Sequence, residues 1–167
     1  MAVVNIKSTA VQNADAAVQS LNPVHLSGAK KYSIVGNAAI AAADDDGSVM
    51  RLARVHSSWR ITGIKIFNDA IAAGAWGLTL YRIAAEGGAA VAAGIYATAF
   101  DAATVHPTGL ETAFAVRTID KIGQQVWQDA GLTADPNLWY DLGFTLTTAG
   151  TAAGKVAWEI EYIAGSS

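Results

Sequence analysis

Hydrophobic and polar residues alternate with a period of two along several short segments, and this period predicts β-strands. The clearest segments in the first two thirds of the chain are 49–56, 59–67, 76–83 and 94–100. In segment 76–83 both alternating faces are largely apolar, as expected of a strand in the middle of a sandwich. The pattern predicts an all-β chain of seven to ten strands, folded as an antiparallel, jelly-roll-like β-sandwich.

The strongest hairpin signal lies near the C-terminal end, where segment 138–148 leads through a small-residue turn into segment 155–164. Each segment has one apolar face, made of Tyr140, Leu142, Phe144 and Leu146 in the first and of Val156, Trp158, Ile160 and Tyr162 in the second. The other face of the second segment carries charged side chains, so we expect an antiparallel pair with one buried side and one wet side. Glu159 and Glu161 share that wet face, and paired carboxylates occur in glycosidases. Because the pattern places no pocket around them, we interpret them as a solvated strand face.

Alanine-rich stretches elsewhere in the chain do not predict helices. Glycine interrupts them every few residues and costs about 1 kcal/mol at each helix-interior position. One segment, 118–132, has the helical spacing of apolar residues, at Ile119, Ile122 and Val126, and Gly131 is placed to end it. We therefore expect one short helix.

Residues 1–28 show no sustained period, yet they contain too many apolar residues for a purely solvated tail. We interpret 1–28 as an extended N-terminal arm that lies on another surface, and 29–167 as the β-sandwich domain. A first strand and loop of the same domain is an open alternative. The candidate partner-binding residues are the apolar residues of the arm: Val3, Val4, Ile6, Val11, Val18 and Leu21.

Charge and cysteine content restrict the function classes. The chain has no cysteine, which excludes disulfides and thiolate-bound zinc, and its net charge of −3 gives no basic field for nucleic acid. Basic residues near aromatic ones could form a stacking platform for single-stranded nucleic acid; they are Arg51, Arg54, Arg60, Lys65 and Arg82. The net negative charge favours cations that lie on strand faces or pair with carboxylates. Neither a signal peptide nor a membrane-spanning apolar stretch is expected.

Three consecutive carboxylates, Asp44, Asp45 and Asp46, are the first candidate for chemistry. Adjacent residues of an extended chain point to opposite faces, so the three cannot converge on one ion without a loop. A calcium loop that began at Asp44 would need glycine at its sixth position and glutamate at its twelfth, where the chain has Val49 and Val55. Asp-Gly between two strand-like segments is a favoured hairpin turn, so we predict a turn here.

The histidines give no catalytic or metal signal. His25, His56 and His106 are far apart in the chain and lack metal-ligand spacing. No nucleophile elbow, phosphate-binding loop or dinucleotide fingerprint is present. We predict no catalytic residue, no metal site and no cofactor.

Three blocks of the chain resemble the decoration, or cement, proteins of tailed bacteriophages. They are VNIKSTAVQNADA at the start, VWQDAGLTADPNLWYDLGFTL before the last strand, and KVAWEIEYI at the end. The resemblance implies a jelly roll or a related β-sandwich, no catalysis, and binding to the major capsid protein at capsomer junctions, often as a homotrimer. It also implies a place on the outer surface of the virion, assembled in the cytoplasm of the bacterial host.

We therefore expect a structural virion protein that stabilises a phage capsid by bridging major capsid protein subunits, without direct contact to nucleic acid or membrane. The 16 glycines and many alanines suit the close approach of flat surfaces. A carbohydrate- or host-surface-binding module that uses Trp59, Trp76 or Trp139 is the alternative. An enzyme would require His56 or His106 to meet carboxylates in a cleft.

Overall fold

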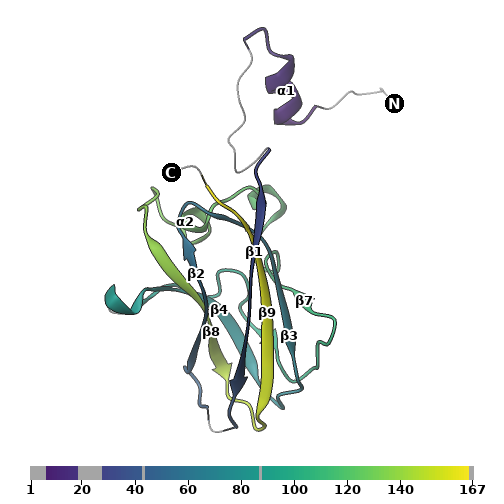
Figure 1. Ribbon diagram of the computed structural model, residues 1–167, viewed down its shortest axis with the longest axis vertical. Coiled ribbons are helices and arrows are strands. Elements are labelled where there is room, and N and C mark those ends of the chain that lie inside the picture. The colour runs from purple at the N-terminus through teal and green to yellow at the C-terminus, as the bar shows by residue number, and fades with distance from the viewer. Residues whose placement is uncertain (1–6, 19–27, 43, 87, 166–167) are drawn as a thin grey trace.

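The fold consists of two antiparallel β-sheets packed face to face (Figure 1). The computed structural model describes residues 7–18, 28–42, 44–86 and 88–165. Sheet A has the strand order β1-β9-β3-β7, and sheet B has the order β2-β8-β4-β5, with β6 also paired to β4. The strands are β1 (Lys31–Ile40), β2 (Val49–His56), β3 (Arg60–Asn68), β4 (Ala75–Arg82), β5 (Ala90–Ala92), β6 (Phe100–Asp101), β7 (Leu110–Glu111), β8 (Trp139–Thr148) and β9 (Gly154–Ile163).

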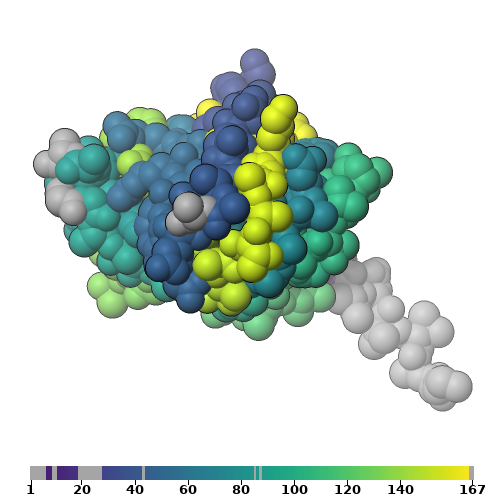
Figure 2. Space-filling model, turned by 90° about the horizontal axis from the view of Figure 1, so that it is seen from below, coloured from purple at the N-terminus to yellow at the C-terminus, as the bar shows by residue number. Residues whose placement is uncertain are grey.

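The chain crosses between the sheets at almost every connection. Strands β1, β3, β7 and β9 lie in sheet A, while β2, β4, β5 and β8 lie in sheet B. The two-residue strand β6 adds to sheet B beside β4, and the other eight strands, four in each sheet, have the arrangement of a jelly roll. The predicted fold class, an antiparallel β-sandwich of jelly-roll type, is confirmed. Figure 2, which views the molecule from below, shows β1 in dark blue beside β9 in yellow, as their pairing requires.

The predicted C-terminal hairpin is wrong, although both of its strands exist. Strand β8 pairs with β2 and β4, whereas β9 pairs with β1 and β3. Their apolar faces bury Leu142, Phe144, Val156 and Ile160 in one core between the sheets. An alternating pattern says which face is buried but not whether the next strand is a neighbour or lies in the opposite sheet.

The acidic turn at 41–48 is likewise a corner between sheets and not a hairpin. It carries the chain from β1 in sheet A to β2 in sheet B. The backbone N–H of Ser48 donates to the carbonyl of Asp45 at 3.0 Å, and Gly47 has a φ of +84°, so the Asp-Gly turn itself is present.

Of the four predicted strands in the first two thirds, three match β2, β3 and β4 to within one residue at each end. Segment 94–100 is the exception, because the chain turns at Gly94, where φ is +66°. Its backbone still bonds to β4 through Ile95 N–H to the carbonyl of Leu78 at 2.9 Å and through Leu78 N–H to the carbonyl of Ala97 at 2.8 Å. Its apolar side chains are therefore buried without forming a regular strand.

The predicted helix over 118–132 is two short pieces, the 3-10 helix η2 (Ile119–Lys121) and α2 (Val126–Asp129). The backbone N–H groups of Val126 and Trp127 donate to the carbonyls of Trp59 and Ser57, at 2.8 and 3.1 Å. These bonds tie the start of α2 to the β2–β3 turn, so one continuous helix does not form. A further 3-10 helix, η1 (Ala84–Glu86), follows β4.

The arm is not extended throughout. Residues Thr9–Asp15 form helix α1, whose N-cap, Ser8, accepts a hydrogen bond from the N–H of Val11 at 3.4 Å. Figure 1 shows α1 beyond the end of the sandwich at which β1 begins. Within the described residues, no helix is long and apolar enough to cross a membrane.

Candidate functional site

Five aromatic rings form a continuous row at the end of the sandwich where β1 begins. We call Tyr32, His56, Trp59, Trp139 and Tyr162 the aromatic surface. Ring centroids are 5.6 Å apart for Tyr32 and Tyr162, 4.0 Å for Tyr162 and Trp59, 5.3 Å for Trp59 and Trp139, and 4.9 Å for Trp139 and His56. Tyr32 is 44% exposed and Trp139 is 45% exposed, so the row reaches the solvent on sheet A and on sheet B.

Strand register and one tight turn position these rings. Tyr32 of β1 lies opposite Tyr162 of β9. Ser57 in the β2–β3 turn donates its hydroxyl to Asp135 Oδ1 at 2.5 Å and accepts from the N–H of Leu138 at 3.1 Å. The turn that carries Trp59 is thereby fixed beside the start of β8, which carries Trp139. The row consequently bridges both sheets.

The arm leaves the sandwich at the same end. Of the candidate residues in the arm, Val11 and Val18 are exposed, Val18 by 87%. The other candidates, Val3, Val4, Ile6 and Leu21, lie outside the described residues. Lys7, which precedes α1, forms an ion pair of 2.7 Å with Asp15 at the last position of that helix. The arm therefore presents described apolar side chains to the solvent, beyond the end of the sandwich that carries the aromatic surface (Figure 1).

A second exposed apolar region, which the sequence did not reveal, lies in the loop 105–122 around β7. Six large apolar side chains of this loop are exposed: Val105, Leu110, Phe114, Val116, Ile119 and Ile122. Ile119 is 94% exposed although its spacing from Val126 suggested a buried helix face. Buried and exposed faces are read from the regular spacing of apolar residues in a strand or helix. An irregular loop has no such spacing, so its exposed apolar residues could not be identified from the sequence.

A buried ion pair anchors this loop to the core. The Arg117 guanidinium binds the Asp129 carboxylate, donates to the carbonyl of Ile61 at 2.8 Å, and lies 4.9 Å from the ring centroid of Tyr96. The Tyr96 hydroxyl donates to Asp129 Oδ2 at 3.0 Å. Burial lowers the pKa of Arg117, but the hydrogen bond and charge of Asp129 outweigh it and hold that pKa above its ordinary value. Arg117 therefore stays charged, and the loop is held in a fixed position.

The basic residues considered for nucleic acid are largely paired within the chain. Arg51 and Arg54 contact Asp141 at 3.4 and 2.8 Å, and Arg82 contacts Glu86 at 3.5 Å. The hydrogen bond and charge of Asp141 raise the pKa of Arg54. Arg51 and Arg54 on β2 and Arg82 on β4 thus lie on sheet B beside carboxylates of the same chain.

Neither described histidine is hydrogen-bonded to a carboxylate. His56 Nδ1 lies 2.8 Å from Ser58 Oγ, and His106 Nδ1 lies 2.9 Å from Asn68 Oδ1. Across the part of the chain that the structure describes, no three His, Asp or Glu side chains gather as metal ligands would.

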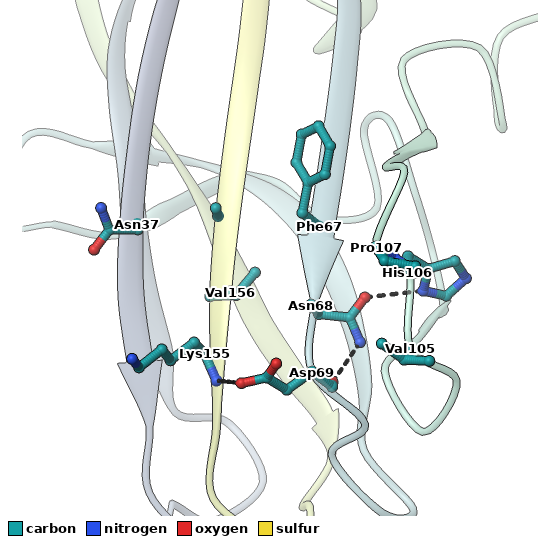
Figure 3. Close-up of a pocket in the computed structure, with 10 residues that line it drawn as sticks. Asn37, Phe67, Asn68, Asp69, Val105, His106, Pro107, Lys155 and Val156 are labelled. Atoms are coloured by element: carbon teal, nitrogen blue, oxygen red, sulfur yellow. Dashed lines mark hydrogen bonds between the residues drawn. The ribbon is translucent and has the colours of Figure 1, made fainter.

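His106 does line a pocket of about 460 Å³ beside sheet A (Figure 3). Asp69 lines the same pocket, but its Oδ2 accepts the backbone N–H of Lys155 at 2.9 Å. The Asn68 amide is fixed by the carbonyls of Asp69, Ala102 and Thr104 at 2.8 to 3.1 Å. Asn68 thus holds the loop after β6 against β3, and Asp69 ties the end of β3 to β9.

Comparison with known proteins finds a similar fold in a solved capsid structure. No protein-family model matches the chain, and no curated protein matches its sequence. A chain of the solved structure "Cyanophage Pam1 capsid asymmetric unit" has a similar fold, with a TM-score of 0.54 and 14% sequence identity. The match covers 90% of this chain and 95% of the cyanophage chain. At that identity the likeness establishes the fold, while the decoration-protein family stays a prediction.

Proposed function

We propose that this chain is a structural virion protein that decorates the outer surface of a phage capsid and bridges subunits of the major capsid protein. The observation that carries the proposal is the structural match to a chain of a cyanophage capsid, which extends over nearly all of both chains. The likeness is therefore not confined to one part of either molecule. The resemblance of the three sequence blocks to decoration proteins supports the same function.

The end of the molecule that carries the arm is the side that faces the shell. Tyrosine and tryptophan are enriched at protein interfaces because they bury a large area at a small cost in side-chain entropy. The aromatic surface offers such rings, and the arm at the same end of the molecule offers the exposed Val11 and Val18. Each well-buried Val, Ile or Leu contributes roughly 1.5–3 kcal/mol, from which the ordering of the arm subtracts.

We propose further that the chain binds the shell as a homotrimer and that it has no catalytic activity. Once one copy of a trimer is bound, the other two are held at a high effective concentration near their binding sites. Weak contacts per copy therefore add up to tight attachment, which stabilises the shell against the pressure of the packaged genome. The enzyme alternative required His56 or His106 to meet carboxylates; in the described residues His56 instead bonds to Ser58 and His106 to Asn68.

Binding to shells of the major capsid protein from the virus that encodes this chain tests the proposal. Co-sedimentation should retain the full chain, lose a variant without residues 1–28, and weaken with Trp139→Ala. Thr147→Ala, at an exposed position near the other end of β8, is the matched control and should bind normally. If the full chain does not bind, the proposed function fails. If the shortened but folded chain binds equally well, the role of the arm fails.

Carbohydrate or host-surface recognition is the second candidate, favoured by the exposed rings of Tyr32 and Trp139. Trp76 is fully buried and takes no part in it. A glycan array should give a signal that Trp139→Ala removes. If the full chain gives no binding signal on the array, this candidate function is rejected.

A further inference from the structure

Strand β1 is a long sheet edge with an unpaired side. It lies at the end of sheet A and pairs with β9 along all ten of its residues, without a shift in register. No strand among the described residues pairs with its other side. In an edge strand every second residue directs its backbone N–H and C=O away from the sheet, so β1 exposes a ladder of unused hydrogen-bonding groups.

The other sheet edges are protected in ways that β1 is not. Strands β5 and β7 have three and two residues, and β2 has a register shift between Arg51 and Ala53 together with two arginines. Short length, bulges, prolines and charges are the features that stop edges from pairing with other chains. Strand β1 has ten residues, no bulge, no proline and one charged residue, Lys31, at its first position. Val35, near its middle, is 72% exposed.

We propose that β1 pairs antiparallel with β1 of a second copy of this chain, about a two-fold axis that passes through Val35. The two sheets A then form one continuous sheet of eight strands. Residues that lie opposite each other in a sheet point to the same face. The two-fold axis must therefore bring one residue opposite its own copy, and it cannot pass between two consecutive residues of the strand. An axis at Val35 pairs residues 31–39 with each other and buries the two exposed valines together.

Charge favours a second copy as the occupant of this edge. Antiparallel pairing brings Lys30 of one copy next to the 41–48 corner of the other, where Asp45 and Asp46 are exposed. Within the described residues, neither Lys30 nor the three aspartates of the corner form an ion pair; the Lys30 ammonium lies 5.4 Å from the Tyr32 ring centroid. The two-fold axis generates this contact twice. It also places Lys31 opposite Ala39, so no like charges meet along the strands.

This inference does not depend on the proposed function. A two-fold contact cannot close a trimer, so it joins copies that belong to neighbouring trimers on a shell, and it produces dimers in solution. Shell binding can therefore fail while the dimer is present, and the dimer can fail while shell binding is present.

Single cysteines test the pairing, because the chain has none of its own. Opposed residues of antiparallel strands have Cα atoms about 4.5–5.5 Å apart, which suits a disulfide. Val35→Cys in the full chain should give a disulfide-linked dimer rapidly on mild oxidation. Ala39→Cys, on the same face of the same strand, is the matched control: its two copies lie about 27 Å apart across the axis and should not crosslink.

Sedimentation of the full chain gives the second measurement. Val35→Lys places two like charges on the axis and should weaken the dimer by about 100-fold, while the unfolding midpoint stays unchanged. The proposal is overturned if the protein stays monomeric up to the highest soluble concentration. It is equally overturned if Val35→Lys leaves the dimer intact, or if Ala39→Cys crosslinks as fast as Val35→Cys.

Discussion

Strands β4 and β1 have the same regular backbone but opposite surroundings. Strand β4 lies inside sheet B, and six of its eight residues are buried. Strand β1 lies at the edge of sheet A, and one of its ten residues is buried. The comparison separates two tasks within one sandwich: the centre of sheet B stabilises the fold, while the edge of sheet A and the nearby aromatic surface are available for contacts.

Two tryptophans show the same division. Trp76 of β4 is fully buried, with its ring centroid 5.5 Å from that of Phe100 and 5.0 Å from that of Phe144. Trp139 of β8 is 45% exposed, and its ring makes edge contacts with Trp59 and His56 at centroid distances of 5.3 and 4.9 Å. One residue type therefore serves the core at one position and a contact surface at the other.

The largest effect is expected from Trp76→Ala. The substitution removes a buried indole and leaves a cavity between the sheets, so the free energy of unfolding should fall by about 4 kcal/mol. Trp139→Ala, the matched control, should cost about 1 kcal/mol or less. Denaturant unfolding of both variants measures the difference. Equal losses would contradict the division between core and contact surface.

Arg117→Ala should destabilise the protein by about 3 kcal/mol, because it leaves the Asp129 carboxylate buried without its cation. Lys121→Ala changes an exposed cation of the same loop and should stay within about 0.5 kcal/mol of the unmodified protein. Thermal unfolding of the two variants side by side checks this. A mild effect of Arg117→Ala would mean that the loop is not anchored by this pair.

Gly36→Ala distinguishes the two faces of β1. A Cβ at Gly36 would approach the Trp158 ring to 2.6 Å, so we expect a loss of about 1–3 kcal/mol from overpacking. Val35→Ala, one residue earlier on the outward face, should change the free energy of unfolding by about 0.5 kcal/mol or less. If both substitutions were neutral, β1 would not be packed against the core as described.

Tyr32→Ala should affect stability less than Trp76→Ala, Arg117→Ala or Gly36→Ala, since this ring is partly exposed and, among the described aromatic rings, stacks on Tyr162. We expect a cost of about 1 kcal/mol or less in unfolding. Shell binding should nevertheless weaken by roughly tenfold, as is typical when an interface ring is removed. Normal binding of the folded variant would exclude Tyr32 from the contact.

The alternating pattern was sufficient to predict strands and buried faces, but not their partners. It located β2, β3, β4, β8 and β9, and it placed Phe144 and Ile160 on core-facing sides. It predicted a hairpin from β8 to β9, but these two strands lie in different sheets. The same two apolar faces can be buried by neighbouring strands of one sheet or by strands that face each other across the core. Only the strand order in the folded structure distinguishes these arrangements.

The surface features were harder to predict, for two physical reasons. The aromatic surface combines β1, β9, the β2–β3 turn and β8, so its rings are distant in sequence. In the 118–132 segment, hydrogen bonds from Val126 and Trp127 to the β2–β3 turn override the local helical spacing. The free edge of β1 depends on the strand order, which the sequence pattern does not contain.

Electron cryomicroscopy of particles assembled from the genome that encodes this chain is the decisive measurement. The proposed function predicts density for this jelly roll on the outside of the shell. The aromatic surface and residues 1–28 should lie against the major capsid protein. Particles without this density, or with the opposite end of the sandwich against the shell, would contradict the account.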